Sequence, residues 1–322
     1  MSREILLSVK DIKKWFPVDD RLFGKPTSYV KAVDGVSFDV YRNEVLGLVG
    51  ESGCGKTTIS RSILGLTTPT EGSIHFEGKE LVGMKKKELQ KMRSDLQIVF
   101  QDPYSSLSPR IRVIDTIIEP MEIQKRGTKQ ERIRRAEELL EIVGLEKSFA
   151  YRYPHEFSGG QRQRIGIARV LAANPKFIIC DEPVSALDVS VRSQILNLLL
   201  ELKRDFDLTV LFISHDLSVV EYVCDRIVVM YLGKVMEVAN RDDLYRNPLH
   251  PYTKALLSAI PIPDPKHKKD RIIIQGDTPS PIDPPKGCRF CTRCANAQEI
   301  CRTETPELRE IEPNHCVACH LV

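Results

Sequence analysis

The sequence predicts an α/β fold with a parallel core sheet, a flanking antiparallel sheet, a helical region and a small cysteine-rich tail. Continuous apolar runs at residues 45–49, 177–180 and 209–213 are each followed by polar or glycine residues and then by a helical pattern. Strand-length runs that are apolar on both faces are typical of buried parallel strands. Their alternation with helices is that of an α/β core.

The elements around this core follow from residue periodicity. Residues 6–10, 36–40 and 73–77 alternate in the manner of strands and predict the flanking antiparallel sheet. Residues 107–145 are predicted to be mainly helical, with the charged stretch 129–141 as a solvated helix. The helix after the second apolar run has one apolar face, formed by Val191, Ile195, Leu198, Leu199 and Leu202. Beyond Asn247, recurring prolines predict a linker that leads to the tail.

Composition limits the function classes. A formal net charge of +3 over 322 residues is too small to argue for nucleic acid, and the basic runs at 85–87 and 267–269 predict only exposed surface. No stretch approaches the roughly 20 apolar residues that a membrane-spanning helix needs. Residues 1–4 lack the basic-then-apolar plan of a secretion signal. We therefore expect a cytoplasmic chain that reaches a membrane only through a partner.

A complete phosphate-binding loop follows the first apolar run and opens a predicted helix at residues 57–64. Its glycines let successive backbone N–H groups point at a phosphate, and the helix dipole adds positive potential. Lys56 is expected to reach the β- and γ-phosphates, and the Thr57 hydroxyl to ligate Mg²⁺. A glycine-rich turn that matches by chance is the alternative. The loop consists of Gly50, Glu51, Ser52, Gly53, Cys54, Gly55, Lys56 and Thr57, and Thr58 follows it.

Two carboxylates end the second apolar run. Asp181 is expected at the sheet edge beside the phosphate-binding loop, where it can hold Mg²⁺ through water. Glu182 can orient and deprotonate an attacking water molecule, which is the role that separates an ATPase from a kinase. A strand end with solvent-facing acidic residues is the alternative.

A second helix start resembles an anion site. Ser158 is a good N-cap, and Gly159 and Gly160 expose backbone N–H groups at the start of a helix predicted at residues 162–173, just after Gln161. Two phosphate-binding helix starts in one chain suggest that the second serves ATP bound to another subunit. An ordinary capped helix is the alternative.

The nine cysteines form two groups. Cys54, Cys180 and Cys224 are predicted to be small core residues. The other six lie between Cys288 and Cys319, with spacings that favour a metal. A disulfide framework would require an oxidising compartment, which nothing in the chain indicates.

The three motifs together resemble the Walker A, Walker B and signature motifs of ABC ATPases, over roughly residues 5–245. Gln101, after a strand predicted at 96–100, matches the Q-loop residue that contacts Mg²⁺ and senses the membrane partner. Asp188 ends the segment that matches the D-loop, and His215 matches the switch histidine at the γ-phosphate. Phe16 falls where the family stacks an aromatic ring on adenine, and a core aromatic is its alternative.

This resemblance implies a P-loop (RecA-like) core with an α-helical signature subdomain. The expected cassette spans residues 1–250, with the helical subdomain at about 103–172, and a C-terminal segment spans 251–322. Two ATPase subunits would pair head to tail, with each ATP between the Walker A of one and the signature of the other. Lys56, Mg²⁺, Glu182 and His215 would then position and neutralise the γ-phosphate for in-line attack.

A narrower resemblance covers the whole chain. Residues 101–110, 153–160 and 247–257 look like the ATP-binding subunits of oligopeptide/dipeptide importers, of the F-type. The family implies a second ATPase (a D-type paralogue), two transmembrane permeases that dock near the Q-loop, an extracytoplasmic peptide-binding protein, and a place on the cytoplasmic face of the membrane. Some members carry nickel or oligosaccharides, so the cargo stays open.

The tail carries the same family's Gly-Cys-Arg-Phe and Val-Ala-Cys-His landmarks at residues 287–290 and 317–320. Some members hold a [4Fe–4S] cluster, for which four thiolates are suited, at the positions of Cys288, Cys294, Cys301 and Cys319. This chain adds Cys291, where His is usual, and Cys316, so which four ligate stays open. A four-cysteine zinc site is the rival, and unliganded thiols are the third case.

Two other function classes compete with the importer. A soluble ABC ATPase of DNA repair or of ribosomes usually has two cassettes or a long coiled-coil insertion, whereas this chain has one cassette and no sustained heptads. A structural iron–sulfur or zinc protein that binds ATP without hydrolysing it is disfavoured by the presence of both Glu182 and His215.

Overall fold

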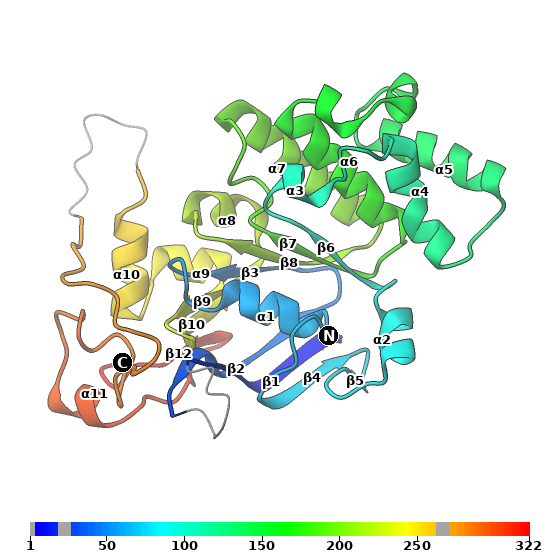
Figure 1. Cartoon of the computed structure of the whole chain (residues 1–322). Helices are drawn as coiled ribbons and strands as arrows, with labels where there is room; N and C mark the ends of the chain where they lie inside the picture. Colours follow the sequence, from blue (N-terminus) through cyan, green and yellow to red (C-terminus); the bar gives the residue numbers. More distant parts are fainter. Residues whose placement is uncertain (1–3, 19–26, 262–270) are drawn as a thin grey trace. The chain divides into compact units, whose positions relative to one another are not determined.

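The computed structural model in Figure 1 describes residues 4–18, 27–261 and 271–322. The chain forms two compact units. The first, which we name the P-loop unit, comprises Met1–Gly83 and Ser214–Val322, and the second, the signature unit, comprises Met84–Ile213. The basic run at 267–269 lies outside the described residues. None of the helices in the described ranges is long and apolar enough to cross a membrane.

The P-loop unit contains two sets of strands. An antiparallel sheet has the order β2-β1-β4-β5, and a second set has the order β11-β12-β10-β9-β3, in which β3 and β9 are parallel and the others antiparallel. The strands are β1 (Ile5–Pro17), β2 (Tyr29–Tyr41), β3 (Val45–Val49), β4 (Glu71–Phe76), β5 (Lys79–Glu80), β9 (Arg226–Tyr231), β10 (Lys234–Asn240), β11 (Arg309–Glu312) and β12 (His315–Val317). The helices are α1 (Lys56–Ile63), α8 (Leu217–Val223), α9 (Arg241–Arg246), α10 (Pro251–Ser258) and α11 (Glu299–Thr303).

The signature unit combines three parallel strands with a group of helices. Strand β7 pairs in parallel with β6 on one side and β8 on the other, and α6 packs against α4, α5 and α3. The strands are β6 (Leu96–Val99), β7 (Phe177–Asp181) and β8 (Thr209–Ser214). The α-helices are α2 (Lys86–Met92), α3 (Pro103–Ser106), α4 (Val113–Ile123), α5 (Lys129–Ile142), α6 (Gly159–Ala172) and α7 (Val189–Asp205), with 3₁₀ turns at Lys147–Tyr151 and Pro154–Glu156.

The predicted strands are confirmed. All residues of β3, β7 and β8 are buried, as continuous apolar runs require. The alternating segments lie in β1, β2 and β4, whose pairings are antiparallel. Burial of Cys54, Cys180 and Cys224 confirms the prediction that they are core residues.

The linker expected beyond Asn247 is wrong for residues 251–258. Residues 251–258 form α10, whose Pro251 occupies the first turn, where a missing N–H is harmless. Tyr252 on this helix is fully buried. The proline-rich stretch therefore begins with a helix that packs into the P-loop unit.

The C-terminal residues are joined to the strands of the P-loop unit. Strand β12 pairs with β10, and Glu237 on β10 is completely buried. Its carboxylate lies 2.7 Å from Nε2 of the buried His315 and accepts the backbone N–H groups of Leu249 and His250 at 2.7 and 3.0 Å. A buried carboxylate needs such partners, and here they tie the tail and the start of α10 to one strand.

Candidate nucleotide site

The phosphate-binding loop joins β3 to α1 within the P-loop unit, as predicted. Gly55, the N-cap residue of α1, has φ +106°, and a Cβ there would lie 2.3 Å from the carbonyl oxygen of Ala32. A Cβ on Gly50 would lie 2.2 Å from the carbonyl oxygen of Met230 on β9. Gly53 has φ +79°. Backbone conformation and close packing therefore both require glycine in this loop.

Lys56 lies against the inside of its own loop. Its Nζ donates to the carbonyl oxygens of Gly50 and Glu51 at 2.7 and 3.0 Å, and the side chain is buried. Burial raises the pKa of the Cys54 thiol, although Lys56 nearby partly opposes this shift. The ammonium is thus held at the centre of the loop, where a phosphate-binding cation is needed. Around it Ser52, Gly53 and Thr57 are exposed, and Thr58 is half-buried.

Two more predicted residues lie in the P-loop unit. Phe16 on β1 is 39% exposed, and the Nζ atom of Lys14 lies 5.0 Å from the centre of its ring. A core aromatic would be buried, so the exposed ring favours a ligand-facing role over that alternative. His215 follows β8, is exposed, and immediately precedes Asp216, the N-cap of α8.

The acidic pair lies in the signature unit. Asp181 ends β7 and is buried, whereas Glu182 is half-buried. Glu182 has φ +49°, a conformation that costs a non-glycine residue of order 1–3 kcal/mol and is concentrated at functional sites. Its N–H donates to the carbonyl oxygen of Ile213 at 3.0 Å, and its Oε2 accepts from Nε2 of Gln101 at 3.0 Å. The structure therefore brings the predicted Q-loop residue to the predicted base.

The predicted signature segment opens α6 with a capping box, so the expected N-cap is confirmed. The Ser158 hydroxyl accepts the N–H of Gln161 at 3.3 Å, and the Gln161 side chain accepts the N–H of Ser158 at 3.0 Å. Ser158 is exposed, Gly159 is half-buried and Gly160 is buried. Asp188, also exposed, is the N-cap residue of α7.

Five of the six tail cysteines line one small cavity in the P-loop unit, together with His250, Phe290 and His320. None of the nine cysteines, all of which lie in the described ranges, forms a disulfide. Burial, with smaller effects of neighbouring cysteines, raises the pKa of Cys288 to about 12. Across residues 4–18, 27–261 and 271–322, no group of three or more His, Cys, Asp or Glu side chains is arranged to hold a metal ion. The cysteines that line the cavity are Cys288, Cys291, Cys294, Cys301 and Cys319.

The tail also supplies contacts to the phosphate-binding loop that sequence reasoning missed. Nη1 of Arg293 lies 2.9 and 3.2 Å from the two carboxylate oxygens of Glu51, and the Thr278 hydroxyl donates to the same carboxylate at 3.1 Å. The N–H of Glu51 donates to the Tyr252 hydroxyl at 3.1 Å. No local pattern announces these contacts, because the partners are more than 200 residues apart.

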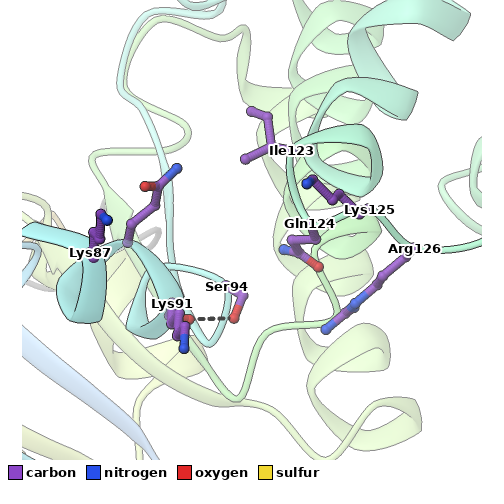
Figure 2. Close-up of a pocket in the computed structure, with 8 residues that line it drawn as sticks. Lys87, Lys91, Ser94, Ile123, Gln124, Lys125 and Arg126 are labelled. Carbon is purple, nitrogen blue, oxygen red and sulfur yellow. Dashed lines mark hydrogen bonds between the residues drawn. The ribbon is translucent and has the colours of Figure 1, made fainter.

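A separate pocket lies in the signature unit, between α2 and the end of α4 (Figure 2). Four of its eight lining residues are basic. None of the predicted nucleotide-site residues lines this pocket, so the pocket is distinct from the predicted nucleotide site. The basic residues are Lys87, Lys91, Lys125 and Arg126.

Comparison with known proteins agrees with these features. The ABC transporter family matches residues 33–185, and the family described as the C-terminal region of oligopeptide/dipeptide transporters matches residues 236–301. The chain is 53% identical to the oligopeptide transport ATP-binding protein AppF of Bacillus subtilis, over 99% of this chain and 98% of that protein. It is 49% identical to the oligopeptide transport ATP-binding protein OppF of Escherichia coli, over 98% of this chain and 96% of that protein.

A solved structure shares the fold. The ATP-binding cassette MJ0796, in a dimeric post-hydrolysis state bound to ADP and Pi, matches with a TM-score of 0.65 and 31% sequence identity, over 73% of this chain and 98% of that one. The matched families, the similarity over nearly the whole chain and the shared fold all agree with the motifs described above. The chain belongs to the family of oligopeptide/dipeptide transporter ATP-binding proteins and is an ABC-type ATPase.

Proposed function

We propose that this chain couples ATP binding and hydrolysis to the uptake of di- or oligopeptides through partner permease subunits. The observation that carries the proposal is full-length similarity to peptide-import ATP-binding proteins, which extends through the C-terminal segment as well as the cassette. The cassette is assigned to residues 1–250, with its helical subdomain at about 103–172, and the transporter-specific segment to 251–322.

The nucleotide chemistry is assigned by position. Lys56 and the loop amides bind the phosphates, Phe16 stacks on adenine, and His215 contacts the γ-phosphate. Mg²⁺, held by Thr57, Gln101 and Asp181, would neutralise phosphate charge. Glu182 accepts a proton from the attacking water, and its hydrogen bond with Gln101 links the base to the residue that senses the permease.

The signature segment is assigned to the ATP of a partner. Ser158, Gly159, Gly160 and Gln161 form a capped helix start whose dipole suits a phosphate, with Ser158 exposed and Gly160 buried. Asp188, which is exposed, lies at a second helix start. A head-to-tail pair with a D-type paralogue would place this surface over the partner's nucleotide. ATP then contributes contacts only in the closed pair, so its binding favours closure.

The assembly is proposed to include two transmembrane permeases and an extracytoplasmic peptide-binding protein, with this chain on the cytoplasmic face of the membrane. Full-length similarity to transport ATP-binding proteins supports these partners.

The tail cysteines are proposed to hold a [4Fe–4S] cluster, with Zn²⁺ as the rival occupant. The donor type suits either, because five thiols line one cavity, although the described side chains as they stand form no group arranged to hold a metal ion. Cys291 is among them, whereas Cys316 does not line the cavity and instead has Glu310 and Arg226 nearby. Burial raises the pKa of Cys288, Cys294 and Cys319, so metal binding by these three thiols would release protons. Metal analysis and the visible spectrum of anaerobically purified protein distinguish iron, zinc and free thiols.

The proposal is tested with Glu182→Gln in the full transporter reconstituted with its permeases. Hydrolysis is expected to fall by at least about 100-fold, with ATP still bound and uptake of labelled dipeptide lost. Glu138→Gln, at a half-buried position of α5 that carries none of the assigned roles, is the matched control. Full turnover in Glu182→Gln would contradict the assigned base, and uptake of nickel or oligosaccharide instead of peptide would contradict the cargo.

A further inference from the structure

The second residue of the phosphate-binding loop is an acid, which is a problem for a site that binds a polyanion. A carboxylate beside the phosphates of ATP repels them, and the repulsion is strong where solvent is partly excluded. The Glu51 side chain is only 28% exposed. The neighbourhood of Glu51 must therefore neutralise it if the loop is to bind ATP tightly.

The tail supplies that neutralising charge. Arg293 lies between Cys291 and Cys294, its side chain is 11% exposed, and its guanidinium contacts both carboxylate oxygens of Glu51. The same Nη1 atom lies 3.2 Å from the Tyr231 hydroxyl and 3.3 Å from the Thr278 hydroxyl. These contacts fix the guanidinium in one place, so the ion pair is a built feature and not a chance surface pair.

The backbone of Glu51 is held from the same side. Its N–H donates to the Tyr252 hydroxyl, and its carbonyl oxygen accepts from Lys56. Tyr252 packs against Phe290 of the tail, with ring centres 5.3 Å apart, and Phe290 also contacts Tyr231 at 5.3 Å. One tail residue thus packs on the aromatic ring whose hydroxyl anchors the loop.

A further tail segment borders the loop. Residues 278–281 line a pocket together with residues 51–54 of the phosphate-binding loop. The carbonyl oxygen of Pro281 accepts the N–H of Lys31 on β2 at 2.9 Å, which holds this segment in place. The tail and the phosphate-binding loop therefore line the same pocket.

We propose that Arg293 is a positioning residue of the nucleotide site: it neutralises and holds Glu51, so that the tail tunes the affinity of the phosphate-binding loop for ATP. The inference rests on the proposed assignment of this loop as the ATP site. It predicts that the tail contributes to ATP binding even when the cysteines and their cavity are left unchanged.

The test measures the dissociation constant for MgATP by titration of the full-length chain. Arg293→Met is expected to weaken binding about tenfold, because it leaves Glu51 unpaired beside the phosphates. Glu51→Gln with Arg293→Met should restore affinity to within about threefold of the wild type, since the unpaired charge is then gone. A merely structural role would not produce this rescue.

The matched control is Arg289→Met, which removes a second arginine–carboxylate pair of the tail, with Asp34. It should lower the unfolding midpoint without changing ATP affinity. Unchanged affinity in folded Arg293→Met, or a double variant as weak as the single one, overturns the inference. If Arg293→Met does not fold, the double variant decides: wild-type affinity supports the inference, and weak binding overturns it. Lys56→Ala tests the assignment of the loop as the ATP site separately from the role of Arg293. If Lys56→Ala bound MgATP with wild-type affinity, the assignment of the loop itself would be wrong.

Discussion

The two helix starts assigned to phosphate, in the P-loop unit and in the signature unit, are built in opposite ways. The phosphate-binding loop encloses its own lysine and uses glycines whose conformation and close contacts exclude a side chain. The signature helix start is capped by Ser158 and Gln161, with Ser158 exposed. Neither Gly159 nor Gly160 has a positive φ, and only at the buried Gly160 would a Cβ clash, at 2.4 Å from Cγ1 of Val191. The first is a finished cradle, whereas the second is proposed to become a site only against a partner subunit.

The largest effect is expected at the lysine of the finished cradle. Lys56→Ala should reduce ATP hydrolysis by at least about 100-fold, because it removes the main charge aimed at the transferred phosphoryl group. ATP turnover by the assembled transporter measures this. The control is Lys79→Ala, an exposed lysine of the same unit, which should hydrolyse ATP normally; equal losses in both variants would contradict the assignment.

Glycine-to-alanine substitutions at the two helix starts should change the free energy of unfolding by different amounts. Gly55→Ala should lower the free energy of unfolding by about 3 kcal/mol, because it combines a positive φ with a clash against the Ala32 carbonyl oxygen. Gly159→Ala should change it by less than about 0.5 kcal/mol, since its Cβ would meet only Leu187 Cδ2 at 3.5 Å. Chemical denaturation of the two variants checks this, and similar costs at both positions would refute the distinction.

Two capping boxes in the signature unit allow a matched test of the exposed helix start. Ser158→Ala on α6 and Thr128→Ala on α5 should each destabilise the chain by about 1 kcal/mol, because each removes an N-cap. Only Ser158→Ala should also lower ATP turnover in the assembled pair. Turnover that falls equally in both variants would mean that the signature cap has only a structural role.

The smallest effect concerns two buried thiols, Cys54 in the phosphate-binding loop and Cys180 next to Asp181 on β7. Burial, with a smaller effect of Asp181, raises the pKa of Cys180 to about 12, whereas near Cys54 the Lys56 ammonium opposes the rise caused by burial. Both thiols stay protonated near neutral pH. The stability due to protonated Cys180 is present below the unfolded pKa and is lost as pH rises towards 12.

Maleimide labelling at pH 8, read by mass spectrometry, should therefore modify both Cys54 and Cys180 much more slowly in the folded chain than in urea-unfolded protein, which is the control. Labelling of either thiol in the folded chain as fast as in urea would contradict the raised pKa values.

Features formed by neighbouring residues could be predicted from the sequence, whereas contacts between residues far apart in the sequence could not. The strands at 45–49, 177–181 and 209–214, the loop before α1 and the Ser158 cap follow from neighbouring residues, so periodicity and motif spacing were enough to predict them. The helix α10 was missed because Pro251 was treated only as a breaker. The pairing of β12 with β10 was missed because it joins residues that lie about 80 positions apart. The contact of Arg293 with Glu51 spans 242 positions and leaves no local signal.

A partner's capped helix start is proposed to complete the ATP site of the finished cradle. Sedimentation of Glu182→Gln with MgATP, alone or with the co-expressed second ATPase, tests this directly. An ATP-dependent pair that Ser158→Arg abolishes, while that variant still binds ATP at its own loop, is the predicted result. Pair formation that depends neither on ATP nor on the residue at position 158 would contradict the claim.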